Sequence, residues 1–383
     1  MMASTRWRAG ALAWLLAFFA SGVGAQQPAP ETPVATRNGL EIYARFREGL
    51  ADPSCDPQTS ARWREHFAAA PTRLISRDNN VLPLFGYVVD ALRAASLPTE
   101  YALIPFVESG YKPGARSAAG PAGLWQMIAV TARNHHVAIQ PGYDGRLSPV
   151  ESTQAAVRYL KTLHGMFAGD WRLAVMAYNA GEYRVFDALK RSGQVARNAN
   201  PDKLVSLSGI SKAYVRKLHA LSCVLDRADD RDGWKQALDR PVPLLEAVVL
   251  PKGTSSLDAW SATSGRDGAA VRRLNPAFAN GRVTNARSGI QILAPMIRSQ
   301  GATLDAGGAV APVEVVADAG GSMQTGNVPA GRTHTVARGE SPWTIARHYD
   351  LRVTDLLARN RLGAGSVLQP GMVLELDADA PGE

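Results

Sequence analysis

The sequence predicts a mainly helical chain that ends in a small module of strands and helices. Apolar residues recur at helical spacing from residue 39 to about residue 228. From residue 241 onward, short apolar runs alternate with helical stretches. The chain has 383 residues, of which 46% are hydrophobic. It can therefore form two or three folded domains, and wholesale disorder is disfavoured.

The first 25 residues have the pattern of a secretory signal peptide. Arg6 and Arg8 precede an apolar run at 9–20, and small residues lead up to Ala25, the expected cleavage point. The run is shorter than the ~20 residues that a membrane-spanning helix needs, and an uncleaved anchor is the alternative. Because the first cysteine is Cys55, we expect no lipid anchor at the mature N-terminus. The protein is predicted to act outside the cytoplasm.

The two cysteines, Cys55 and Cys223, are too few for a four-cysteine zinc site or an iron–sulfur cluster. Outside the cytoplasm they can form a disulfide, which we favour over two buried thiols. The adjacent His135 and His136 are a poor metal site, because neighbouring side chains on a helix point about 100° apart and no third ligand has a matching spacing. We expect no metal and no cofactor.

A tether and a helical domain are expected to follow the signal peptide. Residues 26–38 are rich in proline, alanine and threonine, which is typical of a tether, and the helical domain is assigned to 39–240. Ser148 and Glu151 form a capping box at the start of one helix, and Asp170 is expected to cap the next. The clearest amphipathic helices are expected at 43–50, 81–92 and 155–163.

The remainder of the chain divides into three segments. Segment 241–298 has apolar runs around a helical stretch, and segment 299–332 is a linker dominated by glycine and alanine. The last segment, 333–377, predicts a strand, two helices and a closing strand. Two motifs recur at nearly the same offset: Lys252-Gly-Thr-Ser parallels Arg338-Gly-Glu-Ser, and Leu274-Asn-Pro parallels Arg359-Asn-Arg. This repeat indicates that 241–298 is a degenerate copy of the last module, with chance as the alternative.

Glu108 is the strongest catalytic candidate. It is expected in the last turn of a helix that Thr99 caps and Gly110 ends. The negative end of a helix and apolar neighbours both disfavour a carboxylate, so the pKa of Glu108 should be raised. A carboxyl group that stays protonated near neutral pH can act as a general acid. By itself, a glutamate at a helix end is more often a solvated surface residue, so the assignment depends on the motifs around it.

Several dispersed motifs follow Glu108 in order. They are Gly-Leu-Trp-Gln126, Asp144-x-Arg146, Ser152–Leu160, Phe167–Trp171 and Ala177–Glu182. With this set the sequence resembles the lysozyme-like lytic transglycosylases of glycoside hydrolase family 23, and within them the membrane-bound lytic murein transglycosylase D group. The resemblance implies a mainly α lysozyme-like catalytic domain.

The resemblance also implies residue roles. Glu108 matches the catalytic acid and base, Ser117 a serine that hydrogen-bonds near it, and Gln126 a glutamine that lines the sugar sites. Tyr178 and Asn179 match a pair that orients the glutamate and contacts substrate. Substrate-binding positions are therefore expected at Ser117, Gln126, Met127, Tyr178 and Asn179, with core packing as the alternative for Met127.

The implied reaction cleaves the β-1,4 bond between N-acetylmuramic acid and N-acetylglucosamine in peptidoglycan and forms a 1,6-anhydro ring. One carboxyl group suffices because the nucleophile is the substrate's own C6 hydroxyl, whereas a hydrolase usually needs two carboxylates. The alternatives are a hydrolytic muramidase of the same fold and an inactive peptidoglycan-binding protein.

Asp144 and Arg146 are expected to form a structural ion pair. Tyr183 stands where the family usually has glycine, so a narrower cleft or a more restricted turn is expected there.

The segment 333–377 resembles a LysM domain, a small α+β module of βααβ order that binds N-acetylglucosamine chains. The resemblance implies that its first strand–helix loop, with Gly339, Glu340, Ser341 and Pro342, binds glycan.

The net charge is +8, or +6 without the two arginines of the signal peptide. This charge favours peptidoglycan, whose peptide stems carry carboxylates. No nucleic-acid-binding fold is evident, so glycan strands are the expected partner and the periplasm the expected location.

Overall fold

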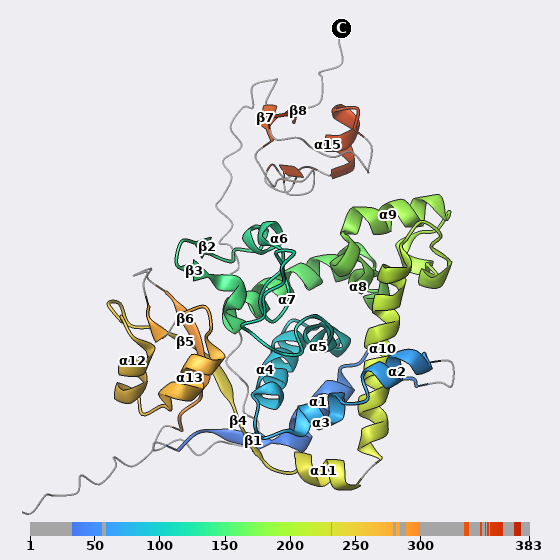
Figure 1. Cartoon of the computed structure of the whole chain (residues 1–383). Helices are drawn as coiled ribbons and strands as arrows, with labels where there is room; N and C mark the ends of the chain where they lie inside the picture. Colours follow the sequence, from blue (N-terminus) through green and yellow to red (C-terminus); the bar gives the residue numbers. More distant parts are fainter. Residues whose placement is uncertain are drawn as a thin grey trace, which may run out of the picture. The chain divides into compact units, whose positions relative to one another are not determined.

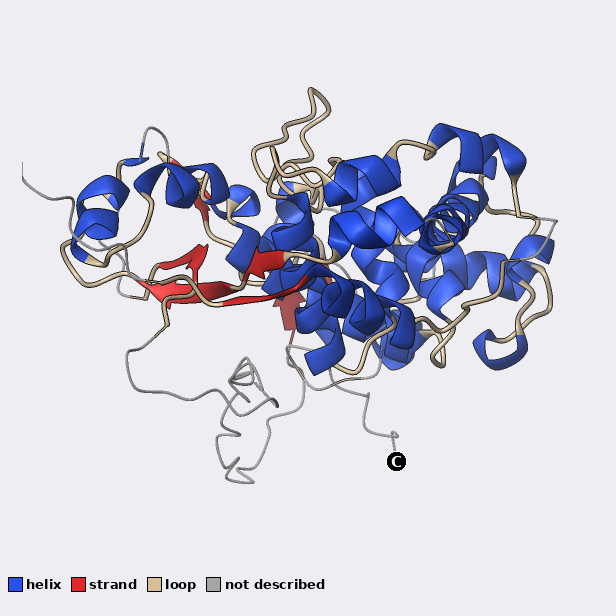
Figure 2. Cartoon of the chain, turned by 90° about the horizontal axis from the view of Figure 1, so that it is seen from below, coloured by secondary structure: helices blue, strands red, loops and turns tan. Residues whose placement is uncertain are grey.

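The computed structural model describes most of the helical domain and parts of the C-terminal module. The described residues are 33–55, 59–230, 232–278, 281–283, 289–298, 333–336, 345–346, 349, 351, 353–362 and 371–376. The predicted signal peptide, the first part of the tether and the linker at 299–332 lie outside them. Helices dominate the described part (Figure 2), which confirms the mainly α fold class.

The helical domain consists of α-helices, which Figure 1 labels, and of short 3-10 helices (η) between them. They are α1 (Gly39–Glu48), α2 (Ala61–His66), α3 (Ala70–Ile75), α4 (Val81–Ala94), the 3-10 helix η1 (Thr99–Leu103), α5 (Ile104–Glu108), α6 (Ala129–Asn134), η2 (Gly145–Leu147), α7 (Pro149–Met166), α8 (Trp171–Ala180), α9 (Glu182–Arg191), η3 (Ala196–Asn198), η4 (Pro201–Lys203), α10 (Gly209–Asp229) and α11 (Asp232–Leu238). Within the described residues, no helix is both long enough and apolar enough to cross a bilayer.

The core of this domain forms where α4, α7, α8 and α10 meet the shorter helices. Leu84, Phe85 and Val88 of α4 are fully buried, which confirms the apolar face predicted for this helix. Burial of each such side chain contributes about 1.5–3 kcal/mol. The long helix α10 packs against α2, α3, α8 and η1. It thereby lies beside the turn that carries Glu108.

Ser148 and Asp170 cap α7 and α8 as predicted, but the capping box of Ser148 and Glu151 is incomplete. The Ser148 N–H donates to the oxygen of Gly145, and the Glu151 carboxylate accepts from Ala138 and Tyr143 instead. Ser148 Oγ accepts a hydrogen bond from the Glu151 N–H at the start of α7. Asp170 Oδ1 accepts from the N–H of Arg172 at the start of α8. These side chains satisfy N–H groups that have no partner within the helix.

The predicted single helix from Thr99 to Gly110 is wrong. The chain forms η1 and then the five-residue α5, with Pro105 in the first turn of α5, where a missing N–H removes no helical hydrogen bond. Thr99 is not an N-cap, because its buried hydroxyl donates to the backbone oxygen of Phe46 at 2.5 Å. A tertiary contact with α1 replaces the local cap. Glu108 nevertheless lies in the last turn of a helix, as predicted, although α5 ends at Glu108 and not at Gly110.

The end of the predicted tether is an ordered strand. β1 (Thr36–Asn38) pairs antiparallel with β4 (Pro241–Pro243), and Val34 forms a bridge with Ile297. Assignment of residues 33–38 to a tether is therefore wrong. Their backbone groups pair with partners that lie more than 200 residues away in the sequence, and local composition does not reveal such a partner.

Segment 241–298 contains two strands around two helices. β5 (Leu245–Val249) pairs antiparallel with β6 (Gln291–Pro295), and α12 (Leu257–Thr263) and α13 (Gly268–Leu274) lie between them in the sequence. In the C-terminal module, β7 (Thr333–Thr335) pairs antiparallel with β8 (Val373–Glu375), and α15 (Val353–Arg359) precedes β8.

Two asparagines make the same hydrogen bonds in these two segments. Asn275 Nδ2 donates to the oxygens of Val271 and Leu293, and its Oδ1 accepts from the Leu293 N–H. Asn360 Nδ2 donates to the oxygens of Leu356 and Glu375, and its Oδ1 accepts from the Glu375 N–H. Each asparagine thus ties the end of a helix to the closing strand. The sequence repeat has a structural counterpart.

The segment around β5 and β6 is docked on the helical domain. The ring of Phe278 lies 5.2 Å from that of Tyr143, which belongs to the hairpin β2 (Ile139–Gln140) and β3 (Tyr143–Asp144). Gln154 of α7 donates to the side-chain oxygen of Gln291 at 3.2 Å. A second hydrophobic cluster joins Ala122, Tyr143 and Leu147 to the buried side chains of this segment.

Candidate active site

Glu108 lies half-buried at the end of α5 and faces α10. Its Oε1 accepts a hydrogen bond from the hydroxyl of Tyr214, a buried residue of α10. The two residues are 106 positions apart in the sequence. Sequence reasoning missed Tyr214, because it shares a helical face with Leu218 and Leu221 and matches an ordinary core position.

Burial raises the pKa of Glu108 above its ordinary value, while the Tyr214 hydrogen bond and the charge of Lys217 partly oppose this rise. The direction matches the sequence-based prediction. Burial, followed by the charge of Glu108, also holds the pKa of Tyr214 well above its usual range, so its hydroxyl remains a donor. The site therefore holds a carboxyl group that is protonated more readily than one in water.

The serine after Glu108 links the acid to the Gly-Leu-Trp-Gln motif. Ser109 Oγ donates to the backbone oxygen of Leu124 at 2.7 Å and also lies 3.2 Å from that of Pro105. Tyr111 donates its hydroxyl to the oxygen of Ala102. The Ser109–Leu124 bond holds the turn that follows α5 against the chain at 123–127, and the Tyr111 bond holds it against η1.

The side chain of Gln126 stabilises the loop that precedes it through two hydrogen bonds. Its Nε2 donates to the oxygens of Gly123 at 2.8 Å and Ala115 at 3.3 Å. Gly123 itself has a φ of +82°, and a β-carbon there would lie 1.7 Å from the backbone oxygen of Arg146. Only glycine fits at this position. The motif therefore sets the path of the backbone beside Glu108.

The predicted ion pair between Asp144 and Arg146 is present, with Nη2 and Oδ2 2.9 Å apart. Arg146 also donates to the backbone oxygens of Gly120 and Met127. This largely buried guanidinium thus joins the β3–η2 turn to both ends of the 120–127 loop. These contacts of Arg146 are those of a structural residue, as predicted from the sequence.

The other predicted site residues lie at different depths. Tyr178 donates its hydroxyl to the oxygen of Trp125 at 2.8 Å, and burial, followed by the charge of Glu108, raises its pKa. Asn179 is exposed at the end of α8, and Ser117 is exposed with its hydroxyl accepting from the Ala119 N–H. Between the described Ser117 and Glu108 there is no hydrogen bond.

Met127 is only 3% exposed and packs in the main core, which favours the packing alternative over substrate contact.

No described carboxylate stands beside Glu108 as a second acid. Glu151 accepts from the Tyr143 hydroxyl and the Ala138 N–H. Asp170 caps α8, and Glu182 accepts from the Tyr159 hydroxyl. Among the described groups, no acid shifts the pKa of Glu108.

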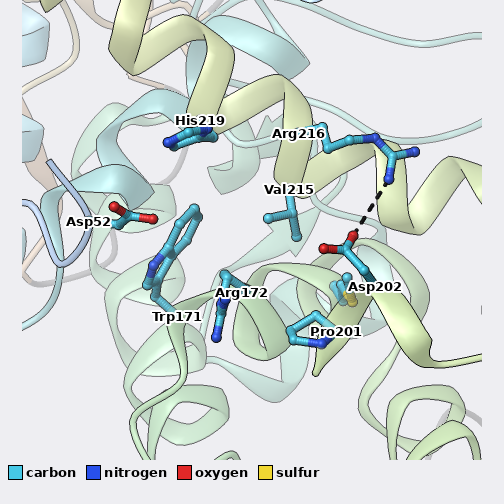
Figure 3. A pocket seen from close by; sticks show the side chains of 9 residues that line it. Asp52, Trp171, Arg172, Pro201, Asp202, Val215, Arg216 and His219 are labelled. Carbon is cyan, nitrogen blue, oxygen red and sulfur yellow. Dashed lines mark ion pairs between the residues drawn. The ribbon is translucent and has the colours of Figure 1, made fainter. Parts of the chain in front are cut away.

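A separate cavity of about 150 Å³ lies between α8, α10 and η4 (Figure 3). Arg216 faces Asp202 across it at 3.8 Å. Its residues on α10, Val215, Arg216 and His219, point to a different side of the helix from Tyr214. The cavity is not part of the Glu108 site.

The structure joins Cys55 and Cys223 in a disulfide, with their Cα atoms 5.5 Å apart.

Among the described residues, no cluster of three histidine, cysteine, aspartate or glutamate side chains could hold a metal ion. The predicted glycan-binding residues Gly339, Glu340, Ser341 and Pro342 lie outside the described residues.

Comparison with known families identifies two parts of the chain. Residues 89–200 match the transglycosylase SLT domain, and residues 334–377 match the LysM domain. The chain contains a transglycosylase SLT domain and a C-terminal LysM domain. The SLT match includes Glu108, Gln126 and Tyr178, but it ends before Tyr214.

Similar proteins include the membrane-bound lytic murein transglycosylase D of Escherichia coli K12, which is 32% identical over 303 residues, or 77% of this chain and 64% of the relative. This chain therefore spans less than two thirds of that relative. The peptidoglycan transglycosylase gp16 of Escherichia phage T7 is 37% identical over 83 residues, or 21% of this chain and 6% of the relative. The solved lytic transglycosylase Slt of Pseudomonas aeruginosa has a TM-score of 0.33 and 18% identity, and the match covers 51% of this chain and 31% of that chain.

Proposed function

We propose that this protein is a lytic transglycosylase of peptidoglycan. It cleaves the β-1,4 bond between N-acetylmuramic acid and N-acetylglucosamine and leaves a 1,6-anhydromuramic acid end. The observation that carries this proposal is the half-buried carboxyl group of Glu108, whose pKa is raised by burial and which accepts a hydrogen bond from Tyr214. The match of residues 89–200 to the SLT domain supports it.

The proposed mechanism uses Glu108 twice. As an acid, Glu108 protonates the leaving glycosidic oxygen, and the substrate's N-acetyl group stabilises the positive anomeric carbon. As a base, the resulting carboxylate removes the proton of the C6 hydroxyl, whose oxygen closes the anhydro ring on the anomeric carbon. The Tyr214 hydroxyl stabilises the carboxylate between these steps. Ser117, Gln126, Tyr178 and Asn179 are proposed to contact substrate.

A hydrolytic muramidase is the alternative for the same site. The absence of a second acid beside Glu108 among the described residues favours the internal nucleophile. Mass spectrometry of digested cell wall separates the two reactions. We expect anhydro ends, which are 18 Da lighter than reducing ends by the loss of one water, and reducing ends alone would overturn the proposal.

Replacement of Glu108 tests whether the protein is an enzyme or an inactive binding protein. Glu108→Gln keeps an acceptor for Tyr214 but cannot transfer a proton, so we expect glycan release to fall by roughly 10²–10⁴-fold. Equal release by the wild type and the variant would remove Glu108 from the mechanism.

The LysM domain is proposed to hold glycan strands through the loop with Gly339, Glu340, Ser341 and Pro342. The proposed location of the protein is the periplasm.

Residues 241–298 are proposed to be a second, degenerate copy of this module. The matching hydrogen bonds of Asn275 and Asn360 support this assignment. In the first copy, Ala277 and Phe278 follow the second helix and are buried, because they belong to the cluster that docks the copy on the helical domain.

A further inference from the structure

The chain that follows α13 contacts two loops of the helical domain. We call Pro276, Ala277 and Phe278 the docking turn. A β-carbon on Gly114 would lie 3.4 Å from the β-carbon of Pro276, so the docking turn lies directly against this loop. The ring of Phe278 lies 5.2 Å from that of Tyr143 in the second loop. The segment 241–298 therefore meets the helical domain at two points that flank the same stretch of backbone.

The docking turn is held firmly within its own segment. The side chain of Asn275 bonds both backbone groups of Leu293 in β6, and the Phe278 N–H donates to the backbone oxygen of Asn275 at 3.1 Å. In the C-terminal module, the corresponding Asn360 is followed by the exposed Arg361. The docking turn thus has apolar residues that contact protein, where the other module has a cation in water.

The first contacted loop leads to the catalytic candidate. Ala115, the neighbour of Gly114, accepts a hydrogen bond from the Gly123 N–H at 2.8 Å. The next residue along, Leu124, accepts from the hydroxyl of Ser109 at 2.7 Å. Ser109 directly follows the acid at the end of α5, so two hydrogen bonds connect this loop to the reacting residue.

The second contacted loop holds the same backbone from the other side. Tyr143 is only 7% exposed and belongs to β3, as does Asp144. Asp144 pairs with Arg146, which donates to the backbone oxygens of Gly120 and Met127. A shift of the Tyr143 ring would therefore be passed on to the 120–127 chain.

The stretch between α5 and α6 contains no helix and no strand of its own. Backbone without a regular hydrogen-bond ladder depends on tertiary contacts to stay in place. We propose that the docked segment 241–298 is a working part of the catalytic domain, in which Phe278 and Pro276 are positioning residues that fix the 115–127 loop beside Glu108. This inference rests on the proposed function.

Phe278→Leu tests the proposal because it removes the ring that contacts Tyr143. The readout is kcat and KM for release of anhydromuramoyl products from soluble glycan strands, measured by liquid chromatography and mass spectrometry. A small displacement of catalytic groups can slow a reaction greatly, so kcat should fall by roughly 10- to 100-fold. Phe278→Tyr keeps the ring and should retain most of kcat.

Trp260→Leu is the matched control. It removes another buried ring of the same segment, which lies 5.1 Å from the guanidinium carbon of Arg266, also in this segment. It should lower the melting temperature about as much as Phe278→Leu, because both lose buried aromatic area, but it should leave kcat unchanged. Melting curves of both variants check that each is folded.

A reversible cross-link tests whether docking itself is what restores the site. The 3.4 Å between the two β-carbon positions is close to the roughly 3.8 Å found in disulfides, so Gly114→Cys with Pro276→Cys should form one. Added to Phe278→Leu, this cross-link should recover most of the lost kcat, and a reductant should abolish the recovery. Phe278→Leu alone, with and without the reductant, controls for the Cys55–Cys223 bond. Peptide mapping by mass spectrometry detects the cross-link.

Several outcomes would overturn the inference. They are wild-type kcat in Phe278→Leu, an equal loss of kcat in Trp260→Leu, a raised KM with unchanged kcat, which indicates that the segment binds glycan, and a cross-link that is absent or leaves kcat low. Each of these leaves the proposed function intact. If the wild type releases no product, the proposed function fails and the positioning role fails with it, while the cross-link still reports the docking.

Discussion

Glu108 owes its acid character to burial and not to the end of its helix. The helix α5 has five residues, so it provides only a small dipole at its C-terminus. Burial is the largest cause of the raised pKa. The direction was predictable from Phe106 and Val107, but the depth of burial depends on α10, which covers the turn from a distant part of the chain.

Loss of the Tyr214 hydroxyl should impair catalysis and shift its pH dependence. Tyr214→Phe removes a hydrogen bond to the carboxylate, which is worth about 1.5–3 kcal/mol, so kcat/KM should fall by roughly 10- to 100-fold. Because this bond lowers the pKa of Glu108, its removal raises that pKa further. The alkaline limb of the pH–rate profile should therefore move to higher pH.

Tyr159→Phe is the matched control for this variant. It removes a hydroxyl that donates to Glu182 at 3.4 Å, so the pH–rate profile should keep its position. A Tyr214→Phe enzyme with the wild-type profile would show that the hydrogen bond has no role in tuning Glu108.

Glu108 should also make the stability of the domain depend on pH. Its pKa is higher in the folded than in the unfolded chain, so its contribution to stability is fully present below the unfolded pKa and is lost as pH rises through the folded pKa. Glu108→Gln has no such dependence. We expect the Tm of Glu108→Gln to exceed that of the wild type by more at pH 8 than at pH 4, as measured by calorimetry. A difference that is the same at both pH values would contradict the raised pKa.

At the scale of elements, the site depends on one loop and one helix. The 115–127 loop follows a path that Gly123, Gln126 and Arg146 enforce. The helix α10 supplies Tyr214 and Lys217 from the same face. The loop has a sequence motif, whereas the helix has only the periodicity of a core helix.

Gly123→Ala should damage this loop. Its φ of +82° and the approach of the Arg146 oxygen leave no room for a β-carbon, so we expect the free energy of unfolding to fall by about 1–3 kcal/mol and activity to fall with it. Urea denaturation and the product assay measure the two effects.

Gly165→Ala provides the matched control in the last turn of α7. A β-carbon there meets nothing within 4 Å, and this variant should raise the free energy of unfolding by about 0.5–1 kcal/mol. Equal stability of both variants would show that the backbone at Gly123 is not restricted.

At the scale of the whole molecule, the Cys55–Cys223 disulfide joins residues 168 positions apart and links the chain before α2 to α10. A bond across so long a loop restricts the unfolded chain strongly. We therefore expect reduction, or a Cys55→Ser/Cys223→Ser double variant, to lower the free energy of unfolding by about 2–5 kcal/mol. Denaturation with and without a reductant measures this fall in the free energy of unfolding. A reductant that destabilises the double variant as much as the wild type would rule out the bond as the cause.

Local patterns predicted much of the fold. The caps at Ser148 and Asp170 and the apolar face of α4 are as expected, and the apolar runs of segment 241–298 form β5 and β6. Each of these features depends on residues a few positions apart. The failures are Thr99 and residues 33–38. Both interact with partners far along the chain, and such partners override local propensity.

The sequence by itself determined that this chain is mainly helical, that Glu108 is its candidate acid, and that a βααβ module closes it, because these properties follow from residue spacing and motifs. Only the tertiary structure decided that Tyr214 donates a hydrogen bond to Glu108, that Met127 is a core residue, and that the charge of Lys217 acts on Glu108. The physical reason is that burial and electrostatic interactions depend on distance in space, and helix packing brings together residues that the sequence separates by more than a hundred positions.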